Sequence, residues 1–210
     1  MCSTATTRLF RVDYGSGFFN THYQIATANN VPLLFCETST YTFGKPDIIL
    51  HAGSSKYGRT VGSVKIGTFG SFKINITRGN KHETMTDEGI FHFRYRWSMA
   101  VPWTSDARME RRQFLWKKTT STQAVHAHAS FIPKSILKLV EEKTNRVIAV
   151  FTHKSQVRGK LQINVSYGEG FDNMIFLTLM GLNVARSRRN SAAGGGGGGA
   201  GCGGGGGGGC

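Results

Sequence analysis

The sequence predicts a mainly β (α+β) fold, in which a closed antiparallel β-barrel surrounds one hydrophobic C-terminal helix. Three observations lead to this prediction. Short segments that alternate with period two recur along the chain, which is typical of a sandwich or barrel. Residues 174–184 are apolar on all sides, so a helix there must be enclosed. That segment is also too short to cross a bilayer, because its helix would span about 16 Å against about 30 Å of hydrocarbon.

The strands are predicted from alternation, and residues 91–97 give the clearest pattern. Tyr95 and Trp97 point to one side and Arg94 and Arg96 to the other, which predicts a half-buried strand with a basic outer face. Further strands are predicted in residues 21–28, 32–40, 47–53, 71–79, 111–120, 146–154 and 160–168, and residues 61–76 are expected to be strand rather than helix. Residues 136–143 fit either a helix or a strand, and a hairpin turn is predicted directly after them.

The helix is predicted over about residues 172–187. Asp172 or Asn173 can cap its first turn. Three arginines suit the negative end of its dipole; they are Arg186, Arg188 and Arg189. Its apolar surface surrounds the axis, which predicts that the helix fills the barrel rather than lying on it.

The chain is expected to form one domain over residues 8–190, because no internal repeat or linker interrupts that stretch. Residues 191–210 are almost all glycine, and glycine has no side chain with which to pack a core. They are therefore expected to be a disordered tail, and residues 1–7 a flexible N-terminus. No signal peptide opens the sequence. The four cysteines are too scattered for a disulfide framework or a zinc site, and a cytoplasmic, possibly peripheral-membrane protein is expected.

The balance of charge favours polyanionic partners. Lys and Arg outnumber Asp and Glu by 26 to 12, a formal net charge of +14. Such an excess suits an acidic membrane surface or nucleic acid. A generally basic, solvated surface remains the alternative.

The segment "LQINVSYGEGFDNMIFLTLMGLNVARSRR", a strand followed by an apolar helix, resembles the end of the tubby-like C-terminal superfamily. That superfamily includes the LURP-one-related proteins and the phospholipid scramblases. The segments "STYTFGKPDIILHAG", "RWSMAVPW" and "RRQFLWKKTT" are similar to its small fungal branch. The resemblance covers residues 8–190. It implies a barrel, usually of twelve strands, threaded by the helix, and, by analogy with tubby proteins, binding of phosphoinositides.

Basic residues on two predicted strands are the candidate lipid- or phosphate-binding site. They are Arg94, Arg96, Arg108, Arg111, Arg112, Lys117 and Lys118. If neighbouring strands bring them together, they form a cationic patch suited to phosphate groups. A solvated strand face is the alternative interpretation. Cys202 and Cys210, in the glycine-rich tail, are candidate sites of lipidation, which would add a second membrane signal; a tail with incidental thiols is the alternative there.

Motifs for catalysis and metal binding are weak. Residues 53–60, "GSSKYGRT", lack the lysine of a phosphate-binding loop, and a strand rather than a helix is expected to follow them. His126 and His128 share one strand face but have no third ligand at a recognisable spacing. The acidic segment 83–88 does not match a calcium loop and is expected near a turn. The sequence therefore predicts no enzyme activity, no metal, no cofactor and no small-molecule substrate.

Two other functions are considered. Phe114 and Trp116 beside Lys117 and Lys118 would suit stacking on single-stranded nucleic acid, although the two aromatics share one strand face and are expected to fill the barrel. Scramblase-like lipid transport would require the apolar helix to leave the barrel, which its short length opposes.

Overall fold

The structure is a computed structural model of the chain. It describes residues 7–16, 21–39, 45–67, 72–76, 81–88, 93–103, 108–119, 135–155 and 158–194. Twelve strands and one helix lie in this part of the chain. The strands are β1 (Arg8–Ser16), β2 (Thr21–Thr27), β3 (Pro32–Thr38), β4 (Ile48–Ala52), β5 (Thr60–Ile66), β6 (Phe72–Ile76), β7 (Lys81–Asp87), β8 (Arg94–Trp103), β9 (Arg108–Thr119), β10 (Ser135–Glu141), β11 (Val147–Ser155) and β12 (Arg158–Ile163).

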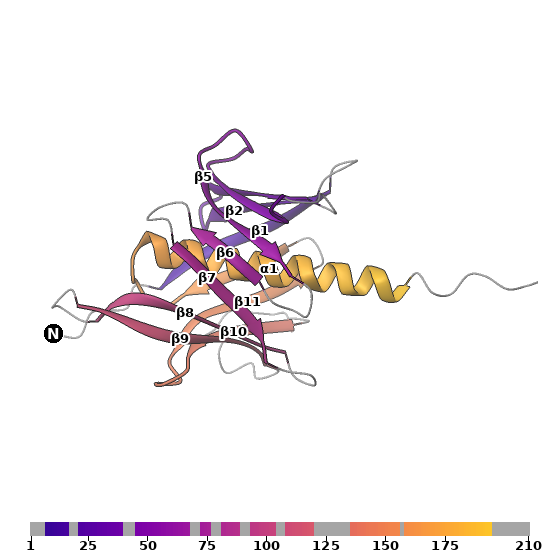
Figure 1. Ribbon diagram of the computed structural model, residues 1–210. Coiled ribbons are helices and arrows are strands. Elements are labelled where there is room, and N and C mark those ends of the chain that lie inside the picture. Colours follow the sequence, from indigo (N-terminus) through magenta and orange to yellow (C-terminus); the bar gives the residue numbers. More distant parts are fainter. Residues whose placement is uncertain are drawn as a thin grey trace, which may run out of the picture.

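The strands form a closed antiparallel barrel, which confirms the predicted fold class (Figure 1). Each strand pairs with its neighbours in the chain, and β1 closes the ring by pairing with β12, where Phe10 lies opposite Leu161. Side chains alternate between the two faces as expected. Tyr95 and Trp97 point into the barrel and are 2% and 1% exposed, respectively. Arg94 lies on the opposite face of the same strand and is exposed to solvent.

Helix α1 (Glu169–Gly194) runs through the barrel (Figure 1). Every residue from Met174 to Met180 is buried, with at most 2% exposure. Gly181 allows the helix to approach the wall closely, because a Cβ there would lie 3.2 Å from the ring of Phe72. The all-round apolar segment is therefore the core of the domain, as its sequence predicts.

The helix begins earlier than predicted. It starts at Glu169, directly after Gly168, whose φ of +96° is one that glycine adopts without strain. Neither Asp172 nor Asn173 is therefore the cap that the sequence suggests: Asp172 lies in the first turn and Asn173 is buried in the helix. Asp172 instead accepts a hydrogen bond from Arg8 at 2.8 Å, which ties the start of the helix to β1.

The helix also ends later than predicted, at Gly194, so the three arginines do not lie in its last turn. Two of them hold the helix to the barrel rim. Arg188 lies 2.8 Å from a carboxylate oxygen of Asp47, before β4, and Arg189 donates to the Tyr95 hydroxyl at 3.0 Å. Burial raises the pKa of Tyr95, so its hydroxyl accepts this hydrogen bond in the neutral form. Charge pairing with the rim thus replaces the expected dipole interaction.

One polar residue interrupts the apolar middle of the helix, and its hydroxyl is fully used. Thr178, 0% exposed, donates to the Met174 carbonyl at 2.8 Å. The same oxygen accepts the indole N–H of Trp116 from β9 at 3.0 Å. This hydrogen bond favours one rotation of the helix against the wall, because a buried donor is stable only when it has an acceptor.

Thr178→Val is expected to lower the free energy of unfolding by about 1–3 kcal/mol, because it leaves the Trp116 N–H buried without an acceptor. Thr178→Ser keeps the oxygen and should cost less. Urea unfolding followed by tryptophan fluorescence measures both. Equal midpoints for the two variants would contradict this account.

Three strands of the structure were not predicted, or not predicted clearly, from the sequence. β1 was not predicted, and β7 lies where residues 83–88 were expected near a turn. Glu83 and Asp87 are thus strand residues, and the alternation there is weak because Met85 is the apolar residue that faces the core. The ambiguous segment is strand β10, and the predicted turn follows it, with Asn145 at a φ of +53°.

Candidate functional site

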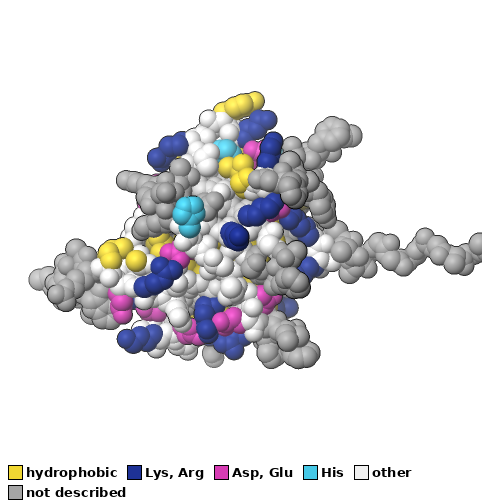
Figure 2. Space-filling model, viewed as in Figure 1, with side chains coloured by type: hydrophobic (Ala, Val, Ile, Leu, Met, Phe, Trp, Pro, Cys, Tyr) yellow, Lys and Arg dark blue, Asp and Glu magenta, His cyan; other side chains and the backbone are white. Residues whose placement is uncertain are grey.

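The predicted basic residues lie on β8 and β9, and every residue of β8 pairs with a residue of β9. Arg94 lies opposite Lys117, and Arg96 opposite Leu115. Directly opposed residues share one face of a sheet, so Arg94 and Lys117 are neighbours on the outer wall. Acidic side chains are close at hand: on the visible face in Figure 2 they gather mainly over the lower part of the molecule, where Figure 1 places β7, β8 and β9.

Two arginines of the predicted patch that are at least one-third exposed are paired with carboxylates. Arg96 lies 2.7 Å from Glu88 and also donates to Glu142. Arg111 reaches across the wall to Glu83. These arginines are 36% and 59% exposed, so solvent screens the pairs and each adds little stability. Their charges are nevertheless largely neutralised, which weakens them as phosphate ligands.

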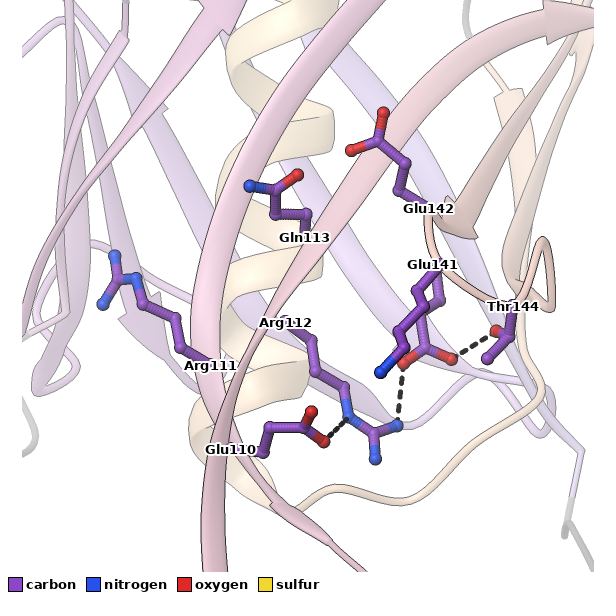
Figure 3. Close-up of a pocket in the computed structure, with 8 residues that line it drawn as sticks. Glu110, Arg111, Arg112, Gln113, Glu141, Glu142 and Thr144 are labelled. Carbon is purple, nitrogen blue, oxygen red and sulfur yellow. Dashed lines mark hydrogen bonds and ion pairs between the residues drawn. The ribbon is translucent and has the colours of Figure 1, made fainter.

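Arg112 does not face the outer surface. It lies in register with the inward residues of β9, such as Phe114, and its side chain is 11% exposed. Its guanidinium is 2.8 Å from Glu141 and 3.1 Å from Glu110, and it sits 5.9 Å from the centre of the Tyr167 ring. Figure 3 shows Arg112 turned toward the two glutamates. Arg112 therefore acts within a structural ion pair.

A cavity of about 370 Å³ lies beside this pair (Figure 3). It forms because β9 continues past the point where its pairing with β10 ends, at Glu141 opposite Phe114. It is lined by Glu110, Arg111, Arg112, Gln113, Glu141, Glu142, Lys143 and Thr144. Acids and bases balance in this lining, so the cavity gives no net attraction for a phosphate group.

A row of three cations crosses three adjacent strands of the outer wall. Arg94 on β8 lies opposite Lys117 on β9, which in turn lies opposite Lys138 on β10. We call Arg94, Lys117 and Lys138 the cation row. In the described part of the chain no carboxylate pairs with any of them; Lys117 donates to the Asn145 side chain at 3.3 Å. The cation row is thus the least neutralised group among the predicted candidates.

Lys138 was not predicted as a site residue from the sequence, because the segment "SILKLVE" has apolar residues on both faces of the strand. Leu137 and Leu139 fill the barrel, while Ile136 and Val140 are buried on the other side of β10. The segment consequently shows no polar face that would single out its lysine. The position of Lys138 opposite Lys117 follows from strand pairing alone.

The aromatic residues of β9 are not available to a ligand. Phe114 and Trp116 are both 0% exposed inside the barrel, as their shared strand face predicted. Lys118, by contrast, is exposed near the end of β9. Stacking on nucleic-acid bases through Phe114 and Trp116 is therefore excluded, because stacking needs an accessible ring face.

The glycine-containing segment before β5 is a turn. Gly53 has a φ of +90°, and strand β5, not a helix, follows. A phosphate-binding loop needs the N-terminus of a helix behind it, so the structure confirms that this segment is not such a loop. Nowhere in the described ranges do three metal-binding side chains gather.

Several candidates lie outside the described residues: His126, His128, Cys2, Cys202, Cys210 and the side chain of Arg108. The cysteine that is described, Cys36, is fully buried. Burial raises the pKa of its thiol far above the usual range, so Cys36 stays a thiol and is unreactive.

No protein-family model matches the sequence, and no curated protein matches it. Over the residues that the structure describes, no helix is both long enough and apolar enough to span a membrane.

Proposed function

We propose that this protein is a non-enzymatic barrel of the tubby-like superfamily that binds the phosphate groups of acidic phospholipids at a membrane surface. The observation that carries the proposal is the cation row. Its three side chains project from one level of the outer wall, where a headgroup phosphate could contact two of them at once. Each basic residue near an acidic membrane surface contributes about 1 kcal/mol of attraction.

The cation row is an unfavourable arrangement for the fold itself. Like charges directly opposite each other on paired strands are destabilising, and Lys117 has one such neighbour on each side. Features that break a local rule of stability are expected at functional sites. A bound phosphate relieves this repulsion, which supports an anionic ligand for the row.

The phosphate groups that the cation row binds could belong to membrane lipids or to a soluble ligand, and two experiments distinguish these sources. Flotation with phosphatidylcholine vesicles, alone or with phosphatidylserine or a phosphoinositide, tests lipid binding. We expect recovery to rise with acidic lipid and most with phosphoinositide. Soluble inositol phosphate tests for a free ligand: if it binds while acidic vesicles do not, the proposal is wrong. A salt-dependent gel shift with RNA, without vesicle binding, would instead favour nucleic acid.

Replacing the central lysine should separate binding from stability. Lys117→Gln is expected to weaken binding to acidic vesicles and to raise the free energy of unfolding by about 0.5 kcal/mol, because it removes repulsion from both neighbours. The gain should disappear at about 1 M salt, where the Debye length is about 3 Å. Urea unfolding at low and high salt measures it.

The matched control removes an exposed lysine from another part of the wall. Lys160 on β12 is exposed and lies three strands from Lys117 in the barrel order. Lys160→Gln changes the net charge equally and should leave vesicle binding close to that of the wild type. Because Lys160 lies opposite Arg11 on β1, the variant is a control for binding and not for stability. If the two variants bind vesicles equally well, net charge and not the cation row is responsible.

A further inference from the structure

Exposed apolar side chains gather on two neighbouring turns. Of the large hydrophobic residues that are exposed in the described part of the chain, three lie there: Tyr57 at 86%, Val31 at 59% and Leu33 at 39%. Leu33 is the second residue of β3, and Tyr57 lies between β4 and β5. A hydrogen bond from the Gly53 N–H to the Leu33 carbonyl at 2.9 Å joins the two turns. Scattered single exposures are ordinary, but a cluster on a projecting edge indicates a contact surface.

The second of these turns is tightly folded, so Tyr57 is presented on a fixed support. The Gly58 N–H donates to the Ser55 carbonyl at 3.2 Å, and the Gly58 carbonyl lies 3.1 Å from Nδ1 of His51. A Cβ on Gly58 would come within 1.8 Å of the Ala52 carbonyl oxygen, so only glycine fits there. A side chain held outward in this way loses little conformational freedom when it binds.

Two cations lie in the turn that carries Tyr57, and the segments of both turns contain no acids. The Lys56 ammonium lies 5.4 Å from the centre of the Tyr57 ring, and Arg59 is exposed beside it. Residues 26–36 and 52–63 contain no Asp or Glu. Figure 2 shows a hydrophobic side chain at the top of the view, over the loop that Figure 1 draws beside β5, with Lys and Arg side chains below it next to a His and one Asp or Glu side chain.

An exposed tyrosine with aliphatic neighbours and a basic border is the composition of an interfacial membrane contact. Tyrosine combines an apolar ring with a polar tip and prefers the headgroup region. Binding of this kind adds apolar burial to attraction for acidic lipids. We infer that Val31, Leu33, Lys56, Tyr57 and Arg59, here called the apolar tip, insert into the headgroup region of an acidic bilayer.

The apolar tip and the cation row lie at opposite ends of the barrel. Successive strands are antiparallel, so the end of β4, where the tip lies, is opposite the start of β8, where Arg94 lies. Strands β4 and β9 are also five apart in the ring of twelve, so the two surfaces lie on opposite sides of the barrel, and one flat bilayer cannot contact both. If the proposed function of the cation row holds, on which this step rests, one molecule can bridge two acidic membranes.

The test compares vesicle binding and vesicle clustering for two variants of the full chain. The tip variant is Val31→Ser with Tyr57→Ser, and the row variant is Lys117→Gln with Lys138→Gln. Flotation with phosphatidylcholine–phosphatidylserine vesicles is measured at low salt and at about 1 M salt, where charge attraction is screened. Turbidity at low salt measures clustering.

We expect the tip variant to lose salt-resistant binding by about tenfold while it keeps salt-sensitive binding. The row variant should show the reverse, and neither should cluster vesicles, in contrast to the wild type. A control removes two exposed apolar side chains that lie at the same end of the barrel but outside the two turns, Leu9→Ser with Met109→Ser, which are 50% and 56% exposed in the wild type. This control should bind and cluster vesicles as the wild type does.

The outcomes separate the inference from the proposed function. A tip variant that matches the wild type at both salt concentrations, with normal clustering, overturns the inference and leaves the cation row intact. Loss of all binding in the tip variant, with normal binding in the row variant, supports the tip and refutes the cation row. A wild-type chain that binds no acidic vesicle refutes both. Unfolding midpoints of the variants confirm that each is folded.

Discussion

Leu177→Arg is expected to abolish folding of the domain. Leu177 lies in the middle of α1 and is 0% exposed. An arginine there would bury a charge without a partner, at an effective cost of several kcal/mol. The lost leucine packing adds about 2–5 kcal/mol. Together these match or exceed the total stability of a typical domain, which is about 5–15 kcal/mol.

Circular dichroism, limited proteolysis and gel filtration of the purified variant measure this loss. Leu9→Arg is the matched control, because it makes the same substitution at a position on β1 that is 50% exposed, and it should leave the fold intact. Leu177→Met keeps volume and apolarity and should cost less than about 1.5 kcal/mol. A folded Leu177→Arg protein would show that the helix can leave the barrel, which would revive a scramblase-like role.

The helix and many strands could be predicted because local patterns of apolar and polar residues indicate which side chains are buried. The helix segment from Met174 to Met180 has almost no polar side chain, so any folded state must enclose it. Tyr95 and Trp97 alternate with arginines, which sets their faces. Closure of the barrel could not be predicted in this way, because it depends on the pairing of β1 with β12, which come from the two ends of the domain. No local pattern specifies that pairing.

The types of residue in the candidate site could be predicted from the sequence. Which of these cations are neutralised by carboxylates could not. The density of Arg and Lys in β8 and β9 is plain in the sequence. Whether each cation stays available depends on carboxylates that the fold brings from elsewhere, as Glu83 of β7 does for Arg111 and Glu142 does for Arg96. Lys138 belongs to the site for the same reason: strand pairing places it opposite Lys117, and its neighbours in the sequence do not indicate this.

Breaking the ion pair of Arg112 is expected to have the second largest effect. Its partner Glu141 is only 4% exposed at the side chain. Arg112→Met leaves that carboxylate buried, with the hydroxyl of Thr144 as its remaining side-chain donor among the residues that the structure describes. Removing one partner of a buried pair costs about 3–5 kcal/mol, because the other charge is left uncompensated. Urea unfolding of the variant measures the cost.

The double variant Arg112→Met with Glu141→Leu decides what the pair does. Well-packed apolar residues can replace a buried pair at little or no cost, so the double variant should recover most of the stability that Arg112→Met loses. Arg146→Met, at an exposed position in the turn after β10, controls for loss of an arginine and should change stability little. If both the double variant and Arg112→Met are equally unstable, Arg112 stabilises the barrel mainly through its contact with the Tyr167 ring. If the double variant recovers, the pair contributes specificity more than stability, since an apolar core would then hold this end of the barrel equally well.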